Sequence, residues 1–218
     1  MKFRTEITPV RWRESIGYDD TILSLGSCFA NNIAAKLAER KFRVVASPTG
    51  ILFNPASIAS AIERMAELKT PCQKELIDVG GRWLSYDFHS DISATTKPEA
   101  IATMQKAIEV GNKALATANY TIITLGTAWV YRLKSSGEVV ANCHKQPHQN
   151  FSRELLSVAD VIEMLERIIK ATQSHIIFTV SPVRHIGEGA EDNSLSKSIL
   201  RVAIAEVCSR YSERTDYA

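Results

Sequence analysis

Long apolar runs and a secretory leader are both missing from this 218-residue sequence. No window approaches the roughly 18 uninterrupted apolar residues of a membrane-spanning helix. The opening MKFRTEITPVRWRES also lacks the apolar core of a secretory signal. We therefore predict no membrane partner and take the cytoplasm as the default location.

An excess of charge of one sign is lacking too. Lys and Arg number 26 against 24 Asp and Glu, which gives a net charge of +2. The basic residues are scattered, whereas binding to a phosphate backbone needs them gathered on one face. We therefore expect no nucleic-acid partner.

Cysteine pairs and cofactor motifs are the third absence. No Cys-x-x-Cys occurs, so we predict neither a disulfide framework nor a zinc knuckle. The four cysteines are expected to be free thiols: Cys28, Cys72, Cys143 and Cys208. Cys143 and His144 are adjacent, but a zinc site needs further ligands. LGTAW offers Gly126 to a phosphate, yet GxGxxG and the P-loop pattern are absent, and we predict no metal and no cofactor.

What is present is an alternation of short apolar strands and amphipathic helices. Strands are predicted at 21–26, 42–47, 120–126 and 175–182. Helices are predicted at 29–41, 56–68, 97–118, 156–173 and 193–213. Glycine-containing turns predict hairpins at 76–86 and 127–145. This order is typical of one α/β domain, spanning 1–218, in which helices cover both faces of a parallel sheet and hairpins are inserted between the units.

The end of the chain departs from this pattern. A sheet of this kind usually follows its last helix with a strand, yet the chain stops at TDYA, just after the helix. We therefore expect the fold to be truncated at its C-terminal end.

The carboxyl ends of the predicted strands carry the candidate site. In parallel sheets covered by helices, ligands bind beyond these ends. The turns at 26–28, 48–50, 126–127 and 181–182 should therefore face one crevice.

The first of these turns places Ser27 and Cys28 together. If the helix begins near Phe29, Ser27 can be its N-cap and Cys28 its first residue. The helix N-terminus favours a nucleophilic thiolate, and its free N–H groups can bind an oxyanion. The alternative is structural: Ser27 only caps the helix, and Cys28 only packs as a small apolar side chain.

A nucleophile needs a base, and three histidines are candidates. His185 lies just past the strand at 175–182, on the crevice side, and is the best placed by topology. His89 and His144 lie on the predicted hairpins, which can fold over the crevice. For each of them, a structural role is the competing interpretation.

Several motifs in this order resemble the GSCFA domain family, which is grouped with the SGNH (GDSL-like) hydrolases. They are LGSCFANNIAAKL, FNPASIA, FHS, TLGTAWVY, NCHKQP and SPVRH, and they cover nearly the whole chain. The resemblance implies a three-layer, flavodoxin-like α/β/α fold.

The resemblance also implies roles for individual residues. GSCFANN aligns with the Gly-Asp-Ser block, so that Cys28 falls on the nucleophilic serine and Ser27 on the aspartate. Gly50 corresponds to the oxyanion-hole glycine. Ala128 stands where an asparagine is expected, so Asn54 or the Thr127 hydroxyl would have to serve.

Other parts of the implied site lie on the inserted segments and beyond the chain. The turns that carry Gly126, Thr127, His89 and Lys145 would line the pocket. The Asp-x-x-His block that supplies the base in this superfamily is missing from the sequence, and the resemblance places it in a segment past Ala218.

The function expected from these features is hydrolysis of acyl or acetyl esters, with esters of carbohydrates among the substrates. An acyltransferase on the same site is equally compatible, because only the acceptor differs. The alternative from a different class is a non-catalytic binding or scaffold protein on a degenerate hydrolase fold. The oligomeric state is not predicted.

Overall fold

A five-stranded parallel sheet is the centre of the computed structural model, which describes residues 15–184 and 189–218. Its strands are β1 (Thr21–Gly26), β2 (Arg43–Ala46), β5 (Tyr120–Leu125), β9 (His175–Val180) and β10 (Thr215–Tyr217). They lie in the order β10-β9-β5-β1-β2, and every neighbouring pair is parallel. Counted along the chain this is the order 2-1-3-4-5 of flavodoxin-like folds. The predicted fold class and the four predicted parallel strands are confirmed.

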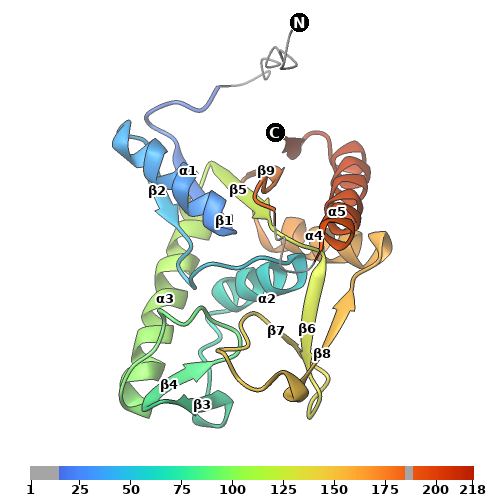
Figure 1. The fold of residues 1–218 in the computed structure, drawn as a ribbon. Coiled ribbons are helices and arrows are strands. Elements are labelled where there is room, and N and C mark those ends of the chain that lie inside the picture. Colours follow the sequence, from blue (N-terminus) through green and yellow to red (C-terminus); the bar gives the residue numbers. More distant parts are fainter. Residues whose placement is uncertain (1–14, 185–188) are drawn as a thin grey trace, which may run out of the picture.

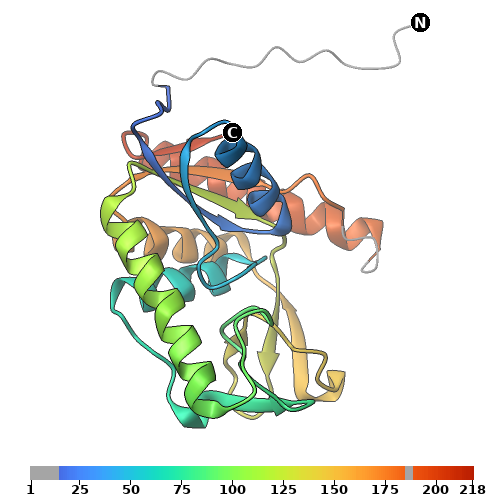
Figure 2. The ribbon, with the colours of Figure 1, turned by 90° about the vertical axis from the view of Figure 1, so that its left-hand side faces the viewer.

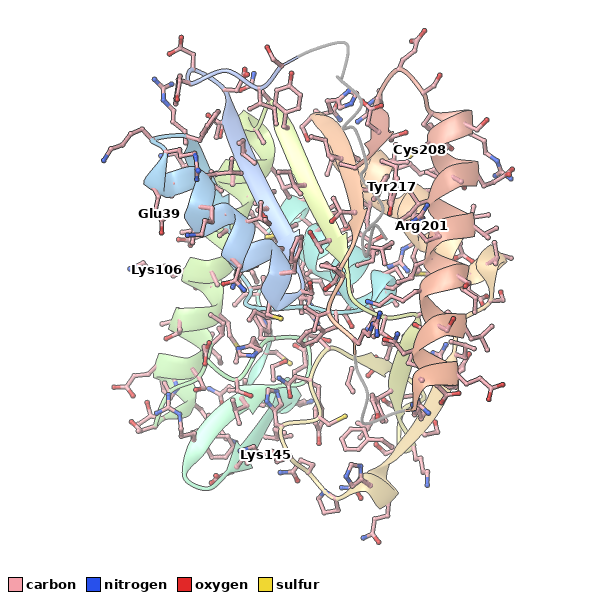
Figure 3. The ribbon with its side chains drawn as sticks, turned by 45° about the horizontal axis from the view of Figure 1, so that its top comes forward. Glu39, Lys106, Lys145, Arg201, Cys208 and Tyr217 are labelled. Carbon is pink, nitrogen blue, oxygen red and sulfur yellow. The ribbon has the colours of Figure 1, made fainter. Side chains whose placement is uncertain are left out.

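Strand β10 corrects one expectation. We expected no strand after the last helix, but Thr215–Tyr217 pairs with β9. The guanidinium of Arg201 lies 4.7 Å from the centre of the Tyr217 ring and so ties this strand to the last helix (Figure 3). Three residues with a charged one in the middle are too few to show a strand pattern in the sequence.

The helices lie close to where the sequence placed them. Their bounds are α1 (Cys28–Glu39), α2 (Pro55–Ala66), α3 (Lys97–Thr117), α4 (Val158–Ala171) and α5 (Ala190–Arg210). The main core joins one face of the sheet to α2, the end of α3, α4 and α5, through side chains that include Leu23, Ile123, Phe178, Ile62, Leu115, Leu165 and Ile204. Helix α1 packs on the opposite face through Ala30 and Ala34, because the step from β1 to β2 runs the other way along the sheet and right-handed crossovers then change face.

The hairpin insertions form a second tier beyond the carboxyl ends of the strands (Figures 1 and 2). One is β3 (Leu76–Val79) with β4 (Arg82–Ser85), preceded by the short 3-10 helix η1 (Gln73–Glu75). The other is a three-stranded sheet of β7 (Val139–Val140), β6 (Trp129–Leu133) and β8 (Phe151–Leu155), with η2 (His148–Asn150) before β8. Both predicted hairpins are present, and β8 is an addition that the sequence analysis did not predict.

Helix α3 connects the two tiers. It begins among the insertions and ends beside the amino end of β5 (Figures 1 and 2). Thr96 caps its N-terminus by accepting a hydrogen bond from the backbone N–H of Glu99. Beneath the insertions, its residues Ala100, Met104 and Ile108 pack with Leu76 and Phe88 in a second core.

Candidate functional site

The turn after β1 is held by the backbone of β5. Gly26 has φ +131°, and a Cβ there would lie 2.1 Å from the carbonyl oxygen of Thr124, so only glycine fits. The next residue, Ser27, donates its N–H to that same oxygen at 3.1 Å. The sequence Gly-Ser-Cys therefore fixes where α1 begins.

Ser27 and Cys28 occupy the predicted positions. Ser27 is the N-cap residue, but its fully buried hydroxyl makes no cap hydrogen bond and has no partner among the described residues. Cys28 is the first residue of α1 and a half-buried free thiol. In the first turn of α1 the Ala30 N–H donates to the Ser27 carbonyl at 2.8 Å, whereas the N–H groups of Cys28 and Phe29 come before the first hydrogen bond of the helix. The thiol therefore stands at the positive end of the helix dipole.

A loop after β2 fills the space between the ends of β1 and β5. The N–H of Leu52 donates to the Gly26 carbonyl at 2.9 Å. The N–H groups of Gly126 and Thr127 both donate to the Phe53 carbonyl, at 2.7 and 3.0 Å. Because β2 and β5 lie on opposite sides of β1, this is the point at which the strand order reverses and where such folds bind ligands.

Gly50 and Thr127, which the resemblance assigned to the oxyanion, make hydrogen bonds within the protein, and so does the neighbouring Gly126. The Gly50 N–H donates to the Ser47 carbonyl at 2.8 Å, and the Gly126 and Thr127 N–H groups bind Phe53. The Thr127 hydroxyl lies 3.1 Å from that of Ser196. An oxyanion at this edge would therefore depend for hydrogen bonds on the first turn of α1 and on the Asn54 side chain.

Asn54 is the N-cap residue of α2. Its side-chain oxygen accepts a hydrogen bond from the N–H of Ser57 at 2.8 Å, and the residue is buried. This contact uses the oxygen and leaves the amide NH₂ as the donor that the side chain can offer. The sequence Asn54-Pro55 explains this helix start, since proline is favoured in the first turn.

His89 lies against the loop after β2. Its backbone N–H donates to the Thr49 carbonyl at 3.2 Å, and a Cβ at Gly50 would lie 2.1 Å from the His89 Cβ. The glycine, with φ +87°, thus allows the hairpin to approach the sheet edge. The His89 Nδ1 lies 3.1 Å from a carboxylate oxygen of Asp91, a geometry that orients the ring.

His144 is a buried side chain on the other insertion, with only 4% of its surface exposed. Its Nε2 lies 2.8 Å from the Ser85 carbonyl oxygen, and its Nδ1 lies 3.0 Å from the Ser90 hydroxyl. Burial lowers the pKa of this imidazole, which favours the neutral ring. Because both ring nitrogens are engaged, His144 is not available as a base for Cys28.

Lys145 and His185 complete the predicted residues. Lys145 is exposed and lies beside the β3–β4 hairpin (Figure 3). His185 lies outside the described residues. The structure therefore brings Ser27, the loop after β2, the Gly126 turn and His89 to one edge of the sheet.

Lys197 is a site residue that the sequence analysis missed. Its ammonium group donates to the carbonyl oxygens of Gly126 and Ser181, at 2.5 and 2.9 Å, and burial lowers its pKa. The neighbouring Ser196 accepts a hydrogen bond from the Ala128 N–H at 2.7 Å. The sequence carries a signal at the neighbouring position. Ser196 lies on the same buried face of α5 as Leu200 and the following turns, where a polar residue is unexpected.

A cleft of about 940 Å³ lies between α2, α4 and the two insertions. Its lining includes the charged pairs Arg64–Asp87 and Arg167–Glu63, but not Cys28. It reaches the hairpins at Ser85, whose carbonyl binds His144. The cleft and the Cys28 turn are thus separate features of the molecule.

Residues 15–184 and 189–218 contain neither a metal-binding cluster nor a membrane-spanning helix. No group of three or more His, Cys, Asp or Glu side chains in these ranges could hold a metal ion. No described helix combines the length and the apolar character needed to cross a membrane.

The parallel sheet with the order 2-1-3-4-5, and a candidate site at its reversal point, define an α/β protein of flavodoxin-like architecture. The profile of the GSCFA family matches residues 21–217, so the chain belongs to the GSCFA family. No curated protein and no solved structure gave a significant match.

Proposed function

We propose that the protein is a hydrolase of SGNH type that acts on acyl or acetyl esters, with Cys28 as the nucleophile. The observation that carries this proposal is the position of Cys28 as the first residue of α1, at the carboxyl end of β1, where the strand order reverses. A thiol at this place has the helix dipole behind it and the N–H groups of the first turn beside it. Carbohydrate acetates are the proposed natural substrates, and the cytoplasm, compatible with four free thiols, is the proposed location.

His89 is the proposed base. Among the other described histidines, His144 has both ring nitrogens engaged, and His175 pairs with Asp216 at the amino end of β9, away from the site. His148 is exposed in η2, on the insertion that ends in β8. His89 lies at the correct edge, and Asp91 orients its Nδ1. In the reaction, the thiol proton passes to His89 while sulfur attacks the ester carbonyl. The alcohol leaves with that proton, and water then releases the acid from the thioester.

Cys28→Ala tests this proposal, with Cys72→Ala as the control because Cys72 is an exposed thiol outside the site. Hydrolysis of p-nitrophenyl acetate should fall at least about 100-fold in Cys28→Ala and in His89→Gln, since each removes a required group. Cys72→Ala should keep the parent rate. An unchanged rate in Cys28→Ala would show that Cys28 is not the nucleophile.

The alternative is a binding protein on a hydrolase-like fold. It is favoured by one observation, that the N–H groups of Gly50, Gly126 and Thr127 all donate to carbonyl oxygens of the protein itself. Under this alternative, Cys28 reacts with iodoacetamide no faster than Cys72, and p-nitrophenyl acetate is not turned over.

A further inference from the structure

The two insertions bring a serine and a histidine together outside the Cys28 turn. We propose that Ser90, with His144 as its base, is a second nucleophile, which takes short acyl groups from activated esters. The proposal rests on a hydroxyl–imidazole–carbonyl chain made by Ser90, His144 and Ser85. It does not depend on Cys28.

The proton positions in this chain follow from its acceptors. The Ser85 carbonyl oxygen can only accept, so the His144 Nε2, 2.8 Å away, must carry the ring proton. In the neutral imidazole, Nδ1 is then the acceptor, and the Ser90 hydroxyl at 3.0 Å donates to it. This is the arrangement of an activated nucleophile, in which the base is held by a third group.

The base is firmly placed. The His144 ring stacks on Tyr86, with ring centres 6.0 Å apart. The backbone N–H of His144 donates to the Asn142 side-chain oxygen at 2.8 Å. His144 also has φ +49°, a left-handed conformation that costs energy for a residue with a side chain and is kept only where the surroundings enforce it. Burial favours the neutral ring, which is the form that can take a proton.

The nucleophile, in contrast, is open to substrate. Ser90 is exposed in a turn closed by a hydrogen bond from the Ile92 N–H to the His89 carbonyl at 2.9 Å. Phe88, with 1% of its surface exposed, anchors this turn in the second core. Ser90 does not line the 940 Å³ cleft, so we assign it short acyl groups, which need no deep pocket.

The step balances with water as the second reactant. The Ser90 oxygen bonds to the ester carbonyl carbon as its proton passes to the His144 Nδ1. The bond to the alcohol then breaks, and the alcohol leaves with that proton. Water, deprotonated by the same nitrogen, cleaves the acyl-serine and restores the hydroxyl.

Labelling of the full chain with a fluorophosphonate, located by peptide mass spectrometry, tests the proposal. The probe should label Ser90 in the parent protein, in Cys28→Ala and in Ser135→Ala. The last of these is a matched control, because Ser135 is also an exposed turn serine, at the tip of the β6–β7 hairpin. Ser90→Ala should lose the label, and His144→Gln should slow labelling by about 100-fold or more.

A second measurement covers the case in which His144→Gln does not fold. In a Cys28→Ala, Ser90→Cys protein, the new thiol beside His144 should react with iodoacetamide about tenfold faster than Cys72 near pH 6, because His144 takes the thiol proton and the resulting imidazolium stabilises the thiolate. Equal rates for the two thiols, or a parent protein unlabelled at Ser90, would overturn the proposal. Since Cys28 is absent from this protein, the outcome is separate from that of the proposed function.

Discussion

Replacing Gly50 with alanine should destabilise the protein because of a single contact at the edge of the sheet. Gly50 has φ +87°, and a Cβ there would lie 2.1 Å from the Cβ of His89. A left-handed conformation costs an alanine about 1–2 kcal/mol. Forcing a carbon atom into a filled space costs about 1–3 kcal/mol more. We therefore expect Gly50→Ala to lower the free energy of unfolding by about 2–5 kcal/mol, out of a typical total of about 5–15 kcal/mol.

Gly80→Ala is the matched control. Gly80 also has a positive φ, of +61°, but a Cβ there would meet nothing within 4 Å. Its cost should be the conformational part alone, about 1–2 kcal/mol. Urea unfolding followed by circular dichroism measures both variants, and the comparison is valid if the slope against urea concentration is unchanged. If the two variants lose the same stability, the contact between Gly50 and His89 does not carry the energy assigned to it.

Two further predictions concern ionic groups. Arg64 is 12% exposed and pairs with Glu75 and Asp87, so Arg64→Met should destabilise by about 1–3 kcal/mol in urea unfolding, because it leaves partly buried carboxylates unpaired. Arg43→Met, which breaks an exposed pair with Asp19, should change the stability by less than about 1 kcal/mol, and a larger loss there than at Arg64 would contradict the reasoning. Burial lowers the pKa of His144 below its unfolded value of about 6.5, so the unfolded chain binds a proton at a higher pH than the folded protein does. The free energy of unfolding should therefore fall as the pH drops below about 6.5. His144→Gln should show a shallower fall over the same range, and an equal slope would place the pH dependence elsewhere.

The sheet could be predicted from the sequence because its strands are nearly continuous apolar runs between turn residues. Residues 21–26 and 120–126 read as buried strands, and the helices between them carry apolar residues at helical spacing. Strands β8 and β10 could not be predicted, since FSREL and TDY hold few apolar residues and are strands only because a neighbouring strand pairs with them.

The candidate site was predictable only in part. The sequence Gly-Ser-Cys after an apolar run predicted both the helix start and the position of Cys28. The engagement of the Gly50 and Gly126 N–H groups depends on how the loop after β2 folds back, which a local pattern does not specify. The place of Lys197 likewise depends on the packing of α5 across the ends of two strands.

The strand order also has a consequence for the way the molecule folds. Strand β1 pairs on one side with the nearby β2, but on the other side with β5, where the Thr21 N–H meets the side chain of Asn119, 98 residues further along the chain. Contacts so distant in sequence form slowly, because a long loop must close before they contribute energy. During synthesis, β1, α1 and β2 can associate early, whereas the β5 side of β1 stays open until the β3–β4 hairpin, α3 and β5 have emerged. The edge that holds Cys28 is therefore completed only after β5 has been synthesised, although Cys28 itself lies in the part that associates first.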